Sequence, residues 1–216
     1  MSRRSTNLLL WCGAVGAPLF IVVFLVEGAT RAGYDPVRLP ISLLSLGERG
    51  WTQTLNFILD GVLLVAFAIG LRQSLSSTGR AATWGPILIG VLGVGVVCAG
   101  LFPTDPGGGY PPGVHPSATS TVTLHDVATL VVFSSLAAAA FVMGQAFAGQ
   151  GQRAWAWYSR ATGAIVVLGF VLIVVAFNGS NDLTRVGGLI QRAAVIAGWT
   201  WIALLAIHQI RSGHPA

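Results

Sequence analysis

Three polar residues interrupt the second apolar stretch of this sequence. Gln53, Asn56 and Asp60 are spaced by three and four residues, which places them on one face of a helix. A carboxylate in apolar surroundings can bind an ion, accept a proton or hydrogen-bond a substrate. It can also be a buried structural group that stays neutral. We expect Asp60 to have a partner, because an unpaired aspartate at the centre of a bilayer costs about 2.5–3.5 kcal/mol.

A second polar group opens the fourth apolar stretch. Thr121, His125 and Thr129 recur every four residues, and Asp126 follows the histidine. Histidine and aspartate can transfer protons or coordinate a metal. However, neighbouring residues on a helix diverge by about 100°, and a zinc site takes three or four ligands. The pattern therefore predicts a polar site without a metal.

Arg192 places a cation near the start of the last apolar stretch. It could form a salt bridge with Asp60 or Asp126, or it could bind an anionic group such as phosphate. Both interpretations remain open. The candidate ligand-binding residues are Asn56, Asp60, His125, Asp126, Arg192, Asp35 and Asp105. The sequence identifies no catalytic residue and no cofactor, since it has no nucleophile elbow, His-Glu-x-x-His helix or Walker motif.

The composition indicates what must position these residues. Of 216 residues, 54% are hydrophobic and 9% are charged, whereas soluble proteins carry about 25% charged residues. A bilayer core requires about 20 mainly apolar residues per helix. We therefore predict one all-α integral membrane domain over residues 1–216, a bundle of six transmembrane helices. The predicted spans are 7–27, 53–72, 83–103, 122–147, 160–178 and 187–208.

The arginines predict the orientation of this bundle. Seven lie at the two termini and in the second and fourth loops, and four lie in the first and fifth loops. Because positive charge is enriched on the cytoplasmic side, we expect both termini in the cytoplasm of a multi-pass plasma-membrane protein. All seven acidic residues then lie at or near the outer side, which predicts a polar cluster open to that face.

The positions of the arginines also indicate which binding partners to expect. They occur singly or in pairs between apolar segments, without the basic stripe and interleaved aromatic residues of a nucleic-acid-binding surface. We expect membrane lipids as partners, with a small molecule or a lipid as ligand, and no nucleic acid.

Two loops carry distinctive motifs. In the first loop, Tyr34-Asp35-Pro36 predicts a turn, and Ile41-Ser42-Leu43-Leu44-Ser45-Leu46-Gly47 predicts a short interfacial or re-entrant segment. The third loop begins with Phe102-Pro103-Thr104-Asp105-Pro106 and continues with glycine and proline. Together with Asn56-Phe57, Gly61 and His125, these motifs resemble the DUF998 family. The resemblance covers nearly the whole chain and implies a six-helix protein of a bacterial-type plasma membrane, but no reaction.

Three functions remain open from the sequence. The first is binding or transport of a small polar molecule, a proton or a lipid headgroup at the outward-facing cluster, because intramembrane charges are costly. The second is a membrane enzyme acting on lipid or isoprenoid substrates, with Asp60 or Asp126 as the acid or base. The third is a scaffold in which the polar residues form only a structural network.

Overall fold

The computed structural model describes residues 3–75, 79–115, 119–179 and 182–212, and six long helices dominate this part of the chain. The helices are α1 (Arg3–Thr30), α2 (Gly50–Ser74), α3 (Arg80–Leu101), α4 (Ser120–Gly149), α5 (Arg153–Asn178) and α6 (Gly187–Ser212). Two short 3₁₀ helices, η1 (Ile41–Ser45) and η2 (Asp182–Arg185), lie in the loops. All six long helices are apolar and long enough to cross a membrane. The prediction of an all-α six-helix membrane bundle is confirmed.

The helix ends differ slightly from the predicted spans. The third span, 83–103, extends beyond Leu101, where α3 ends just before Pro103. In contrast, α5 starts at Arg153, seven residues before the predicted start at Arg160. The prediction assigned these seven residues, about two turns, to the preceding loop because Arg153 is charged, although the backbone is already helical from Arg153 onward.

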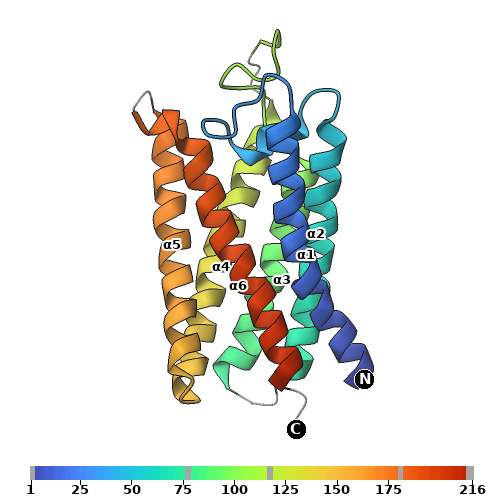
Figure 1. Ribbon diagram of the computed structural model, residues 1–216, viewed down its shortest axis with the longest axis vertical. Coiled ribbons are helices and arrows are strands. Elements are labelled where there is room, and N and C mark those ends of the chain that lie inside the picture. Colours follow the sequence, from blue (N-terminus) through green and yellow to red (C-terminus); the bar gives the residue numbers. More distant parts are fainter. Residues whose placement is uncertain (1–2, 76–78, 116–118, 180–181, 213–216) are drawn as a thin grey trace.

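The six helices close into a ring. Each helix packs against the next one in the chain, and α6 packs against α1 (Figure 1). Both termini lie at one end of this ring. We call the opposite end, formed by the connections after α1, α3 and α5, the distal end. The prediction that the end with the termini faces the cytoplasm stays a prediction.

Small residues allow the helices to approach closely. A Cβ atom at Gly61 of α2 would lie 2.5 Å from the carbonyl oxygen of Gly93 of α3, and one at Gly93 would lie 2.7 Å from that of Gly61. No larger residue fits at either position without separating the two helices. Such close packing drives the association of helices in a membrane. The hydrophobic effect contributes little there, because an apolar side chain is as well accommodated by lipid as by another helix.

The first loop fills the distal end of the ring. Ile41, Leu43 and Leu44 of η1 are almost completely buried there. The backbone N–H groups of Gly188 and Leu189 donate to carbonyl groups of this loop, so the loop also caps the first turn of α6. The segment predicted as interfacial or re-entrant is thus a compact plug anchored to α6.

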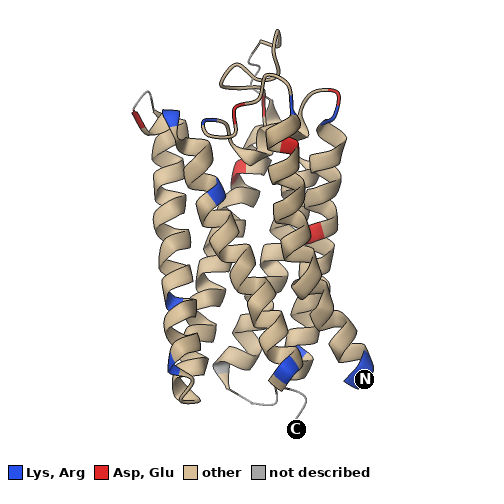
Figure 2. Cartoon of the chain, in the orientation of Figure 1, with Lys and Arg blue, Asp and Glu red and all other residues tan. Residues whose placement is uncertain are grey.

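Charged residues are distributed unevenly along the bundle (Figure 2). The acidic residues lie in the distal half, whereas arginines occur at both ends. Many large apolar side chains of the helices are exposed between these ends, as a lipid-facing surface requires.

Candidate functional site

A cavity of about 50 Å³ lies inside the ring next to η1. Its wall is mostly apolar, with side chains from α1, η1, α2, α3, α4 and α6. The polar lining residues are Ser42, His125, Thr129 and Gln191, and Trp199 contributes its indole ring. Its lining, apolar with a few polar groups, resembles that of a small-molecule site, but its volume is well below the usual range of about 300–1,000 Å³. Any specific recognition in this cavity therefore depends on these polar groups.

His125 is held at the end of α3. Its Nδ1 lies 2.8 Å from the carbonyl oxygen of Phe102 and 3.2 Å from that of Ala99. Both partners are acceptors, so Nδ1 carries the proton and donates to them, and Nε2 is left as an acceptor. Nε2 has no hydrogen-bond partner among the residues that the structure describes. The histidine thus caps α3 and leaves one acceptor at the cavity wall.

Gln191 supplies the complementary group. Its Oε1 accepts a 2.7 Å hydrogen bond from the backbone N–H of Ile41 in η1. Its amide nitrogen makes no hydrogen bond within the described part of the chain. Together with the hydroxyl groups of Ser42 and Thr129, the cavity therefore offers at least one donor and one acceptor to a bound group.

Asp60 has a partner, as predicted, and the partner is Trp199. The indole Nε1 donates to Oδ2 of Asp60 at 2.7 Å, and the carboxyl group is buried with 2% of the residue exposed. The indole ring also stacks on Phe20, with ring centroids 5.2 Å apart. Because Trp199 lines the cavity, Asp60 helps to fix one of its walls. Oδ1 of Asp60 has no partner among the described residues.

Arg192 does not form the salt bridge considered for it. In the described structure it pairs with neither Asp60 nor Asp126. Its guanidinium donates instead to the carbonyl oxygens of Leu39 and Gly188, both at 3.0 Å, and to the hydroxyl of Tyr34 at 2.6 Å. The oxygens of Leu39 and Tyr34 become available to Arg192 because the first loop folds back over α6, whereas Gly188 belongs to α6 itself. Arg192 thus anchors the first loop to α6.

Tyr34 also holds the first loop against α6. Burial raises the pKa of its hydroxyl, and the neighbouring Arg192 offsets this only in part. The hydroxyl therefore stays protonated at neutral pH and can donate to the carbonyl oxygens of Leu39 and Pro40. Its ring also lies against the guanidinium of Arg192, 5.6 Å from ring centroid to Cζ.

The remaining candidates do not line the cavity. Asn56 is buried and donates to the carbonyl oxygen of Phe20, which links α2 to α1. Asp35 accepts from the backbone N–H of Val37 in a turn, and Asp105 accepts two hydrogen bonds from Thr119. Asp126 is exposed. The expected single cluster is thus divided, and of the predicted residues His125 lines the cavity while Asp60 contacts it through Trp199. Their role in ligand binding stays a prediction.

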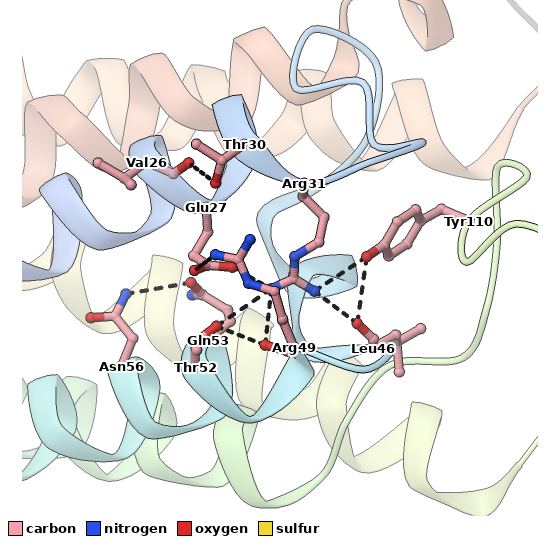
Figure 3. A network of polar contacts seen from close by, with 10 residues as sticks. All are labelled: Val26, Glu27, Thr30, Arg31, Leu46, Arg49, Thr52, Gln53, Asn56 and Tyr110. Carbon is pink, nitrogen blue, oxygen red and sulfur yellow. Dashed lines mark hydrogen bonds and ion pairs between the residues drawn. The ribbon is translucent and has the colours of Figure 1, made fainter.

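The largest ionic network was not among the predicted site residues (Figure 3). The carboxylate of Glu27 pairs with Arg31 and, at 2.7 Å, with Arg49. Arg31 also donates to the carbonyl oxygens of Arg49 and Leu46 and to the hydroxyl of Tyr110. The network joins the end of α1 to the start of α2 and to the first and third loops. The spacing of Glu27 and Arg31, four residues apart at a helix end, is the signal that could have found it.

Arg31 remains a cation in this network. Its burial by itself would lower the pKa of the guanidinium, but the hydrogen bonds to Glu27 and Tyr110 outweigh that effect and raise it. Arg31 therefore stays charged, and its ion pair with Glu27 stabilises the distal end rather than the cavity.

Metal-binding side chains are not concentrated anywhere in the described residues: no group of three or more His, Cys, Asp or Glu residues lies together. Ser42, Gln191 and Trp199 line the cavity although they were not predicted as site residues. Neutral polar and aromatic residues are common in apolar helices, so their positions in the sequence carried no signal of their own.

A ring of six apolar helices around a small, mostly apolar cavity defines a multi-pass, all-helical membrane protein. The model of the family described as "Protein of unknown function (DUF998)" matches residues 14–208. The chain belongs to this family, which confirms the resemblance inferred from the loop motifs. No curated protein and no solved structure matches the chain.

Proposed function

We propose that this protein binds a small, uncharged polar molecule, or the uncharged polar end of a lipid, in the cavity beside η1. The observation that carries the proposal is a pair of groups on two lining residues, Nε2 of His125 and the amide nitrogen of Gln191, that have no hydrogen-bond partner among the described residues. Neither atom is among the fully buried atoms without a partner, so both are accessible to a bound molecule. A ligand hydroxyl, carbonyl or amide would satisfy both groups at once.

The lining favours an uncharged group over an ion. None of the residues lining the cavity is Asp, Glu, Arg or Lys. An ion placed there would lose its hydration without a counter-charge, which is strongly unfavourable. The size is also restrictive: about 50 Å³ holds a few water molecules at roughly 10–15 Å³ each. Only a small molecule or one polar end group fits.

Binding is better supported than transport or catalysis. Transport past the distal end would require η1 to move out of the bundle. This is unfavourable, because its residues Ile41, Leu43 and Leu44 are almost fully buried. Catalysis on a lipid or isoprenoid would require an acid and a base, and the lining residues include one histidine and no Asp, Glu, Lys or Arg. We also assign the protein to a plasma membrane, as the family resemblance implies.

Native mass spectrometry of the protein in mild detergent tests the proposal. We expect a reproducible bound mass in the wild-type protein. Ala99→Leu should abolish it by filling the cavity, and Thr129→Val should weaken it by removing one hydroxyl at nearly constant volume. Thr162→Val is the matched control, because Thr162 is buried in α5 and bonds its own helix at the carbonyl of Tyr158.

Two results would overturn the proposal. One is a folded wild-type protein that carries no bound mass, which favours the scaffold. The other is a bound mass that survives Ala99→Leu, which places the ligand elsewhere.

A further inference from the structure

A groove of about 400 Å³ runs between α2 and α3 near the end that carries the termini. Its sides are formed mainly by apolar residues, among them Val65 and Ile69 of α2 and Pro86 and Ile87 of α3. It lies on the opposite half of the bundle from the cavity beside η1 and shares no lining residue with it. The groove is therefore a separate feature of the lipid-facing surface.

Two small residues keep the groove open. Ala68 and Gly90 face each other across the helix pair, and a Cβ atom at Gly90 would lie 3.7 Å from the Cβ of Ala68. That is an ordinary contact, so the backbone does not require glycine here for close approach. The missing side chain leaves space that an apolar chain from the bilayer can fill.

One end of the groove carries a positive charge. Arg72 lies in the last turn of α2, is exposed and lines the groove. Its guanidinium makes no hydrogen bond or ion pair with any described residue. Trp84 of α3, 54% exposed, lies at the same end of the bundle. Exposed tryptophan marks the level of the lipid headgroups, so Arg72 is placed where a lipid phosphate would be.

We infer that this groove binds an anionic phospholipid, with one acyl chain lying between α2 and α3 and the headgroup phosphate against Arg72. The apolar walls account for the acyl chain, and Arg72, which has no partner among the described residues, accounts for the charge. An arginine near a membrane surface attracts anionic lipid by about 1 kcal/mol, which corresponds to roughly a fivefold preference. Bidentate contact with phosphate adds geometric selectivity.

The test is a lipid titration followed by native mass spectrometry. The purified full-length protein is mixed with phosphatidylglycerol or phosphatidylcholine carrying the same acyl chains. We expect tighter binding of phosphatidylglycerol. Arg72→Gln should reduce this preference about fivefold, whereas Arg153→Gln, an exposed arginine at the same end, should preserve it. Equal losses in the two variants would overturn the inference, because they would indicate unspecific attraction.

A second pair of variants tests the groove itself. Gly90→Leu should fill it and abolish high-affinity binding of phosphatidylglycerol. If that variant does not fold, Ile87→Trp serves instead, because Ile87 is already exposed and its replacement covers the groove from the lipid side. Retained binding in a folded variant of either kind would overturn the inference. Ala99→Leu should leave phosphatidylglycerol binding unchanged, which separates this site from the cavity beside η1.

Discussion

The carboxyl group of Asp60 on α2 accepts a 2.7 Å hydrogen bond from the indole nitrogen of Trp199 on α6. The two residues are 139 positions apart, and their contact crosses the interior of the ring. Asp60, a residue whose burial in an apolar segment is energetically unfavourable, thus serves to orient an aromatic ring that forms part of the cavity wall. We treat Asp60 as a positioning residue, because it does not itself line the cavity.

This relationship predicts different effects for two replacements of Asp60. Asp60→Asn keeps a carbonyl oxygen for the indole N–H, and we expect unfolding free energy and ligand binding close to wild type. Asp60→Leu leaves the buried N–H unpaired, which costs about 1–3 kcal/mol. Thermal unfolding in detergent measures the difference, and tryptophan fluorescence reports the changed environment of the ring. If the two variants behave alike, the hydrogen bond to Trp199 is not what Asp60 contributes.

The buried pair of Glu27 and Arg31 predicts a second outcome (Figure 3). Glu27→Gln leaves Arg31 as an uncompensated buried cation, and we expect a loss of about 3–5 kcal/mol in unfolding free energy. Arg49→Gln is the control: its side chain is half exposed, and exposed pairs contribute about 0–1 kcal/mol.

The double variant Glu27→Gln/Arg31→Gln makes the test specific. Removing both charges should restore much of the lost stability, because no unpaired charge remains. Denaturation with sodium dodecyl sulfate measures all four proteins. A double variant as unstable as Glu27→Gln alone would show that the charge on Arg31 is not the source of the penalty.

The arginine distribution predicts a third outcome, the orientation in the membrane. With seven arginines on the side of the termini and four on the other, a fluorescent reporter fused after residue 216 should be active in the cytoplasm. A periplasmic phosphatase fused at the same point should be inactive, and the reverse pattern should follow for fusions in the third loop. An active phosphatase at the C-terminus would show the opposite orientation.

The number and nature of the helices could be predicted from the sequence alone. A membrane span depends on the hydrophobicity of about 20 consecutive residues, which is a local property. The requirement that Asp60 have a partner was equally local, because the cost of burying a carboxyl group does not depend on which neighbour relieves it. The family, too, could be inferred from short motifs in two loops together with Asn56-Phe57, Gly61 and His125 in the helices.

The identity of the partners was decided by the tertiary structure. Asp60 meets an indole and Arg192 meets loop carbonyls, although an aspartate and an arginine in apolar helices suggested each other. Periodicity shows which residues share a face of one helix, but it does not show which way that face turns. The rotation of each helix follows from contacts such as Gly61 with Gly93, and the fold of the first loop over α6 supplies oxygens that no helical pattern encodes.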